Sequence, residues 1–417
     1  MPDTSELPRR VDTKTTAQRV HFLDWLKVLG ILGVVLAHAG QPFFTNGWLI
    51  SNKETSPVVD LVAAFIYPVG MPLFFLLAGA SCRFSLRRRS PVQFLRERIT
   101  RLLVPYLVAA LLLTPIVAYY ELIHVGSWPG DSIVAFVLSA QARAIFFATP
   151  PIRLTGPELF ERFGYHLWFV AYLFVFATFA LPLFLWLKQK AGQRVVRFLA
   201  RLARRRGGLL AFAVPLVATR LTLQPLFPAY SGWSDFFYWL GFYVYGYILV
   251  NDERFMQSIR RDWPIHLFLS LASTLLLVYW LRVDLILGWL WSPDRAGFYL
   301  VWAVVSLGGW TWTLSVVFLG MRYLNFGSRW LEYSREASFP IYIVHFPVVV
   351  IIAFYVVRWE VGTGVKFFAI ALASVAISLG LYELLIRQFN PVRVLFGMRP
   401  RETPLPAPSR SREQLTP

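Results

Sequence analysis

The stretch "FLDWLKVLGILGVVLAHAGQPFF", residues 22–44, is an apolar run long enough to cross a lipid bilayer. Asp24 and Lys27 lie near its beginning, and a single histidine, His38, lies in its second half. Because unpaired backbone groups are too costly in lipid, the run is predicted to be a transmembrane helix. An ionisable side chain inside such a helix costs about 2.5 to 3.5 kcal/mol on insertion, so His38 is a candidate functional residue.

Similar apolar runs recur along the whole chain of 417 residues. Hydrophobic residues make up 57% of the composition and charged residues 15%, which is more apolar than a soluble domain. We predict an all-α, polytopic integral membrane helix bundle with about ten transmembrane helices. The segment 132–149 contains polar residues and is expected to be a surface or re-entrant helix in a long loop. The predicted spans are 28–44, 58–82, 102–120, 166–187, 209–226, 236–250, 265–281, 298–320, 338–357 and 366–386.

Positive charge is distributed unevenly between the predicted loops. With the N-terminus in the cytoplasm, 31 of the 41 Lys and Arg residues fall on the cytoplasmic side and 8 on the other. The positive-inside rule therefore predicts that both termini are cytoplasmic. Because this asymmetry accounts for the formal net charge of +18, no nucleic-acid partner is expected.

The chain is predicted to have three parts. Residues 1–21 form a cytoplasmic N-terminal tail, 22–390 the membrane domain, and 391–417 a disordered cytoplasmic C-terminal tail. The single cysteine, Cys82, excludes an intrachain disulfide and a two-cysteine metal site. No bound metal is expected.

Lys27 and His38 are eleven residues apart, so they lie on nearly the same helix face, about 16 Å apart along the axis. A cation near the cytoplasmic end and a base farther in would suit a channel that an anionic cofactor enters. The alternative is that Lys27 extends to the membrane surface and that His38 only packs between helices.

Arg98 and Arg101 lie at the cytoplasmic beginning of the third span, three residues apart. Such a pair can hold phosphate oxygens, although positive-inside charge alone would also account for it. In the ninth span, Ser338, Tyr342 and His345 share one helix face. There His345 could be a second base, a substrate hydrogen-bond partner or a contact between helices.

Aromatic and polar residues gather at the predicted outer side. His166 and Trp168 lie at the outer boundary, and Trp233 and Asp235 lie in an outer loop. Aromatic rings there could stack on sugars while a carboxylate binds hydroxyls, although an interfacial aromatic belt is the alternative. Arg220, inside the fifth span, is a further candidate for contact with substrate.

Taken in order, these motifs resemble those of the membrane acyltransferase family three over residues 22–390. Lys27 departs from the family pattern, in which Arg is usual, and lysine supplies a point charge without the fork that a bidentate contact needs. A weaker likeness, in "HFLDWLKVLG" and "HLWFV", is to the branch that includes glucan-modifying proteins of the bacterial envelope. The matching elements are Lys27 with His38, "MPLFFLLAG" at 71–79, the series Phe94, Arg98, Arg101 and Pro105, "HLWFV" at 166–170, and "SFPIYIVH" at 338–345.

The resemblance implies an O-acyltransferase of the plasma membrane. The acyl group would pass from cytoplasmic acyl-CoA to a hydroxyl of an envelope glycan or another exported acceptor at the outer face. Direct transfer with a base is expected, because no cysteine is placed to carry the acyl group. The implied roles are His38 as general base, Tyr342 and His345 in support, and Lys27, Arg98 and Arg101 on the acyl-CoA; His166, Trp168, Arg220, Trp233 and Asp235 are expected to contact substrate.

Two other classes of protein fit part of the pattern. A proton-coupled small-molecule transporter could use Arg220 or Glu383 as its coupling residue, and a membrane scaffold would need neither. Against the transporter, Glu383 can pair with Arg387 one helical turn later. In addition, no two Gly- or Pro-broken half-helices stand out in the sequence.

Overall fold

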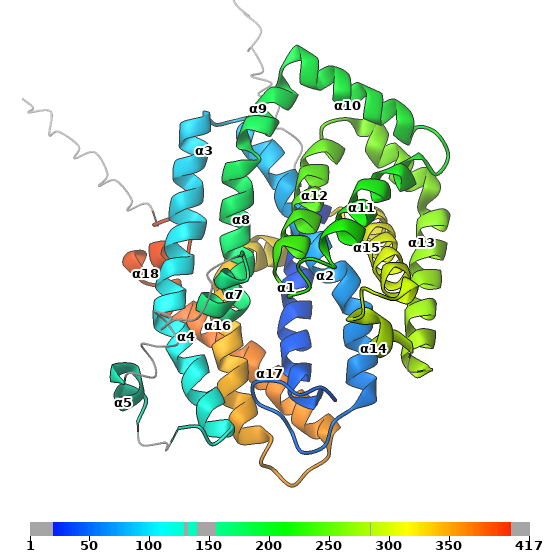
Figure 1. Ribbon diagram of the computed structural model, residues 1–417. Coiled ribbons are helices and arrows are strands. Elements are labelled where there is room, and N and C mark those ends of the chain that lie inside the picture. The colour runs from blue at the N-terminus through cyan, green and yellow to red at the C-terminus, as the bar shows by residue number, and fades with distance from the viewer. Residues whose placement is uncertain (1–19, 129–131, 140–155, 284, 402–417) are drawn as a thin grey trace, which may run out of the picture.

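The computed structural model describes residues 20–128, 132–139, 156–283 and 285–401, and in these ranges it consists of helices and loops without a strand (Figure 1). The fold class predicted from the sequence is thereby confirmed. The first half contains α1 (His21–Gly40), α2 (Pro57–Leu86), α3 (Pro91–Arg98), α4 (Val104–His124), α5 (Ile133–Leu138), α7 (Leu159–Gly164), α8 (Trp168–Phe179), α9 (Leu181–Lys188) and α10 (Lys190–Ala203). The second half contains α11 (Ala213–Leu223), α12 (Trp233–Leu249), α13 (Glu253–Arg282), α14 (Leu285–Leu290), α15 (Ala296–Tyr323), α16 (Arg329–Val356), α17 (Thr363–Leu381) and α18 (Asn390–Leu395).

Every predicted span falls on a helical segment, but the number of complete spans is smaller than ten. Within the described residues, seven helices are long and apolar enough to cross a membrane, or eight if the bent pair of α7–α8 and α9 is one span. The helix at Gly208–Leu223 is shorter, and α12 has 17 residues. Because 17 residues extend about 25 Å and the hydrocarbon core is about 30 Å thick, the predicted count of ten is approximate.

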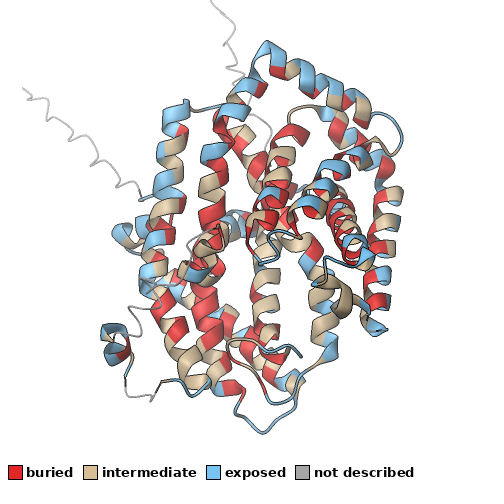
Figure 2. Ribbon diagram, viewed as in Figure 1, coloured by how far each residue is buried: buried red, intermediate tan, exposed pale blue. Residues whose placement is uncertain are grey.

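Helices α2 and α12 form the centre of the bundle and touch backbone to backbone. A Cβ added to Gly79 would lie 1.8 Å from the carbonyl oxygen of Tyr243, and one added to Gly246 would lie 1.9 Å from that of Leu76. Glycine is therefore required at both positions, as at other close helix crossings in membranes. Aromatic rings fill the space around this crossing, including Phe75, which stacks on Trp239. Figure 2 shows that buried residues line the inward sides of the helices.

Helix α1 packs against α2, α15, α16 and α17. Its side chains therefore face helices that are far away in the sequence. At the end of the bundle where α3 begins, α10 lies across the other helices (Figure 1). This helix packs on the bundle through its buried side, at Val196 and Ala200. The helix and the loop after it carry Arg194, Arg197, Arg201, Arg204, Arg205 and Arg206.

Two predicted segments are described only in part. Of the segment 132–149, residues 133–138 form a short helix and residues from 140 onward lie outside the described ranges. Of the C-terminal tail, α18 packs on the bundle through Arg393, whose Nη2 donates to Glu336 at 2.8 Å. Residues 402–417 lie outside the described ranges, so the disorder expected there stays a prediction.

Candidate active site

Three histidines from distant parts of the chain meet inside the bundle. His38 comes from α1, His166 from the short 3-10 helix Tyr165–Leu167, and His345 from α16. The ring centre of His345 is 5.1 Å from that of His38 and 5.1 Å from that of His166. His345 is fully buried, whereas His38 is partly exposed. Nε2 of His345 lies 3.1 Å from Nδ1 of His38, so the two imidazoles form a hydrogen-bonded pair.

The partners of this pair determine which nitrogen carries each proton. Nδ1 of His345 lies 2.5 Å from the carbonyl oxygen of Tyr342, and because a carbonyl only accepts, this nitrogen donates. In a neutral His345 ring, Nε2 is then the acceptor, and it accepts from Nδ1 of His38. The same Nδ1 lies 3.0 Å from the carbonyl oxygen of Val34. Because a carbonyl oxygen only accepts, Nδ1 of His38 is the donor in this contact too. Nε2 of neutral His38 therefore carries the lone pair.

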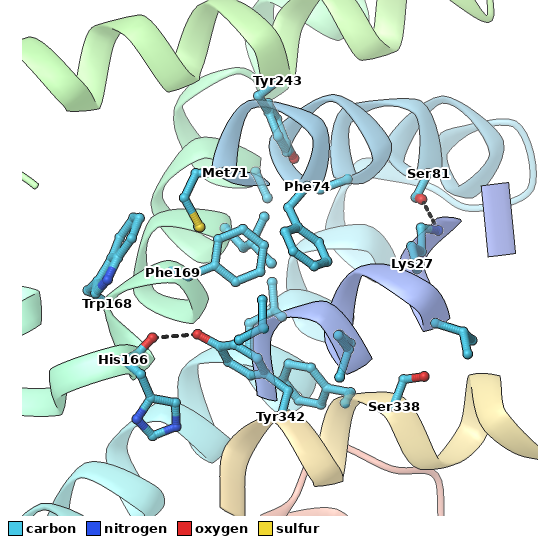
Figure 3. Close-up of a pocket in the computed structure, with 18 of the residues that line it drawn as sticks. Lys27, Met71, Phe74, Ser81, His166, Trp168, Phe169, Tyr243, Ser338 and Tyr342 are labelled. Carbon is cyan, nitrogen blue, oxygen red and sulfur yellow. Dashed lines mark hydrogen bonds between the residues drawn. The ribbon is translucent and has the colours of Figure 1, made fainter. Parts of the chain in front are cut away.

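His166 is fixed by contacts with α16. Its Nε2 donates to the carbonyl oxygen of Ile343 at 3.1 Å, and its own carbonyl oxygen accepts from the Tyr342 hydroxyl (Figure 3). Its ring stacks on Phe346 at 4.7 Å between ring centres. With Nε2 donating, Nδ1 of His166 is an acceptor, and it is buried without a partner among the described residues.

Two cavities approach the histidines from opposite ends of α1. The first, about 340 Å³, is called the Lys27 cavity, and the second, about 980 Å³, the Trp48 cavity. His345 lines neither. The Lys27 cavity is lined, among others, by Lys27, Ser81, Arg98, Arg335, Ser338 and Tyr342. The Trp48 cavity is lined, among others, by Gln41, Trp48, Tyr67, Glu161, Tyr165 and Phe346. Both cavities are lined by His38, His166, Trp168 and Tyr230.

The Lys27 cavity is cationic at the end away from the histidines. Nζ of Lys27 donates to the hydroxyl of Ser81 at 2.7 Å and lies 4.0 Å from a carboxylate oxygen of Asp24. Figure 3 shows Lys27 and Ser81 on one side of the cavity and His166 on the opposite side. The guanidinium of Arg98 lies 4.7 Å from the ring centre of Phe94, and its Nε is buried without a partner among the described residues. Such groups suit an anionic ligand.

Arg101, which the sequence places beside Arg98, points elsewhere. Its Nε donates to the carbonyl oxygen of Gly397 at 3.1 Å, and its Nη1 lies 3.5 Å from Glu97. The cause is a π-helix at Ile99–Leu103, between α3 and α4. A π-helix has more residues per turn than an α-helix, so a spacing of three no longer brings two side chains to one face.

The other predicted substrate residues divide into two groups. His166 and Trp168 line both cavities, whereas Arg220, Trp233 and Asp235 line neither. Arg220 is 2% exposed and donates to Asp235, and its guanidinium lies 4.3 Å from the ring centre of Tyr238. Trp233 stacks on Phe237.

The second residue considered for proton coupling, Glu383, is also paired. It accepts from Arg387 at 2.9 Å and from the hydroxyl of Tyr333 at 2.5 Å. Cys82 lies in the wall of the Lys27 cavity with its Sγ 2.9 Å from the hydroxyl of Tyr243. Among the residues that the structure describes, no three His, Cys, Asp or Glu side chains are grouped as metal ligands.

Several cavity residues were missed in the sequence. Arg335 lies one turn before Ser338 on α16, so the face that carries Tyr342 and His345 could have indicated it. Ser81, Gln41, Tyr67 and Glu161 carry no comparable signal, because no motif or spacing distinguishes them from other residues near a membrane surface. Their position in the cavities depends on how the helices pack.

Comparison with known proteins gives one family and a set of relatives. A family model described as an acyltransferase domain matches residues 20–383. Glucans biosynthesis protein C of Salmonella schwarzengrund (strain CVM19633) is 24% identical over 398 residues, which cover 92% of this chain and 96% of the relative. The proteins of the same name from Salmonella heidelberg (strain SL476) and Salmonella typhi are each 25% identical with the same coverage. No solved structure matches the chain significantly.

Proposed function

The chain belongs to this acyltransferase family, and from this premise we propose that it transfers an acyl group from acyl-CoA to a hydroxyl of an envelope glucan, with His38 as general base. The observation that carries the proposal is the position of His38. It lies where the two cavities meet, with Nδ1 held by hydrogen bonds and with the lone pair of Nε2 available. A base held by a second group in this way is typical of sites for acyl transfer.

The Lys27 cavity is proposed to hold the donor. Lys27, Arg98 and Arg335 supply positive charge at the end away from His38, which suits the phosphate groups of a coenzyme A thioester. The pantetheine arm would then follow the apolar middle of the cavity, past Phe74 and Phe169, towards His38. The positive-inside distribution supports a cytoplasmic opening for this cavity, where acyl-CoA is available.

The Trp48 cavity is proposed to hold the acceptor. It leads to His38 from the other end of α1 and is the larger of the two. The relatives named glucans biosynthesis protein C support a glucan as the acceptor. With one substrate in each cavity, both reacting groups reach His38 without either substrate crossing the whole membrane.

The chemistry follows from the state of the histidine pair. Nε2 of His38 removes the proton of the acceptor hydroxyl as the oxygen attacks the thioester carbonyl. The new carbon–oxygen bond forms, the carbon–sulfur bond breaks, and the proton passes from Nε2 to the departing thiolate. His345 accepts the hydrogen bond from Nδ1 of His38 throughout, so it holds the ring in one orientation and favours the protonated ring that forms.

A variant of the base tests the proposal. Purified wild-type and His38→Ala protein in lipid discs are incubated with an acyl-CoA and a neutral glucan oligosaccharide, and ester formation is measured by mass spectrometry. We expect His38→Ala to lower kcat by about 100- to 10,000-fold, because a well-placed base contributes that much. His21→Ala, at the beginning of the same helix and outside both cavities, is the matched control. A His38→Ala protein that folds normally and keeps the wild-type rate would contradict the proposal.

A further inference from the structure

Three polar groups that line the Trp48 cavity offer a free hydrogen-bond acceptor. Nδ1 of His166 and Oε1 of Gln41 are buried without partners among the described residues. Glu161 adds a carboxylate, whose Oε2 accepts from the hydroxyl of Ser231 at 2.5 Å and whose other oxygen has no recorded donor. The described residues that line this cavity include neither Lys nor Arg.

Such a set of acceptors selects a ligand that donates. A sugar hydroxyl can donate to each of these atoms, whereas an ionised phosphate or carboxylate offers only acceptors and carries the same charge as Glu161. A buried acceptor left without a donor is costly, so an anionic ligand would meet both repulsion and unpaired groups. The chemistry of the cavity therefore favours an uncharged ligand that is rich in hydroxyls.

Aromatic rings form the wall beside Glu161. Tyr67 and Tyr230 both line the cavity, and their ring centres are 6.1 Å apart. Tyr67 is 44% exposed and Tyr230 is 38% exposed. Trp168 contacts Tyr230 edge to face at 5.7 Å and fixes its position. Tyrosine combines an apolar ring with a polar hydroxyl, so this wall can cover the C–H face of a sugar while the carboxylate binds its hydroxyls.

The position of Glu161 depends on a buried ion pair. Ser231, which donates to Glu161, has a φ of 53°, a conformation that a non-glycine residue rarely adopts. Two contacts hold its backbone: its N–H donates to Asp235 at 2.9 Å, and its carbonyl accepts from Tyr172. Asp235 is itself paired with Arg220. The Arg220–Asp235 pair thus fixes the turn that presents the serine hydroxyl to Glu161.

We propose that the Trp48 cavity is a binding site for an uncharged sugar, in which Glu161 binds the hydroxyls and Ser231 is a positioning residue. The proposal rests on the proposed function and adds to it the residues that recognise the acceptor and the exclusion of anionic glucans. It also gives the Arg220–Asp235 pair a role in the site, although neither residue lines the cavity.

Direct binding of sugar tests the proposal without the reaction. The probes are a neutral glucose oligosaccharide and its carboxymethylated form, and their dissociation constants are measured by calorimetry on the protein in lipid discs. Wild-type protein is expected to bind the neutral probe at least tenfold more tightly than the carboxymethylated one. Glu161→Gln should weaken binding of the neutral probe about tenfold, since a charged acceptor is replaced by a neutral one. Glu158→Gln, in the same turn but outside both cavities, is the matched control and should bind like wild type.

Ser231→Ala tests the positioning role. It is expected to raise the dissociation constant of the neutral probe several-fold while the KM for acyl-CoA stays the same, because the donor occupies the other cavity. General unfolding would change both constants. Ser231→Gly, which suits the φ of 53° but also lacks the hydroxyl, should weaken binding as much as Ser231→Ala does.

The outcomes separate this proposal from the proposed function. If Glu161→Gln binds the neutral probe as wild type does, or if wild type prefers the carboxymethylated probe, the sugar site is wrong, even where acyl transfer depends on His38. If wild type binds the neutral probe through Glu161 but transfers no acyl group to it, the proposed function fails and the sugar site stands.

Discussion

At the scale of the residue, identical side chains have different roles because their surroundings differ. His38 and His345 are both imidazoles on membrane helices, yet only His38 lines the cavities. His345 is enclosed, donates to the Tyr342 carbonyl and offers its remaining nitrogen to His38. We therefore interpret His38 as the reacting group and His345 as the residue that orients it.

Arg98 and Arg101 allow the proposed donor site to be tested at the same scale. Arg98→Ala is expected to raise the KM for acyl-CoA about 10- to 100-fold, because hydrogen bonds to charged groups contribute about 1.5 to 3 kcal/mol. Arg101→Ala should change this KM by no more than about twofold, since its guanidinium binds Gly397 and Glu97 outside the cavity. Steady-state rates at varied acyl-CoA concentration give both constants. Equal effects of the two substitutions would contradict the assignment of Arg98 alone to the donor.

At the scale of the element, α2 and α12 determine how closely the centre of the bundle can pack. Their contact depends on Gly79 and Gly246, where each backbone approaches the other helix directly. Residues on both sides of this contact belong to the site: Met71 and Ser81 of α2 line the Lys27 cavity, as does Tyr243 of α12. The helix crossing thus sets the width of the cavity as well as the stability of the bundle.

Alanine at either glycine should separate the two helices. Because the contacted atoms are backbone, they cannot move aside, and we expect Gly79→Ala and Gly246→Ala to destabilise the protein by about 3 kcal/mol, at the upper end for overpacking. The change is measured as a lower Tm in detergent. Gly380→Ala on α17 is the control, because an added Cβ there meets no atom within 4 Å and alanine favours helix. A Tm for Gly246→Ala equal to that of Gly380→Ala would show that the crossing is looser than described.

At the scale of the whole molecule, the two cavities lie in series and share four lining residues. Lys27 marks one direction of approach and Trp48 the other, at opposite ends of α1. His166 and Trp168, just before and at the beginning of α8, lie inside the bundle at the point where the cavities meet. The arrangement suits a reaction whose two substrates come from opposite sides of a membrane.

The orientation of the molecule is testable with thiol labelling. In right-side-out membrane vesicles, a membrane-impermeant maleimide is expected to label Lys53→Cys, whereas Arg205→Cys should react only after the vesicles are permeabilised. Both positions are exposed, and the positive-inside rule predicts opposite sides of the membrane for them. The parent protein, whose Cys82 is 2% exposed, is the control and should stay unlabelled. Labelling of Arg205→Cys alone in sealed vesicles would reverse the proposed orientation.

Within the site, the sequence indicated single residues more readily than their neighbours. Lys27, His38 and Tyr342 could be selected because each is a polar group on an apolar helix, where its cost is evident from the local sequence. Glu161 could not be selected in this way, because it belongs to no apolar run. Its carboxylate is held by Ser231, which lies 70 positions later in the chain. The separation of Arg98 and Arg101 was equally hidden, because a π-helix leaves no clear sign in the local pattern.

The sequence by itself determined that the chain is a membrane bundle of helices, which motifs it shares with acyltransferases, and that His38 is an ionisable group in an apolar helix. These properties depend on the cost of placing each residue in lipid, which is local along the chain. Only the tertiary structure decided that His345 meets His38, from 307 positions away, and that two cavities meet at His38. The physical reason is that a hydrogen bond or a cavity wall depends on how distant helices pack. The free energy of placing one residue in lipid contains no information about that packing.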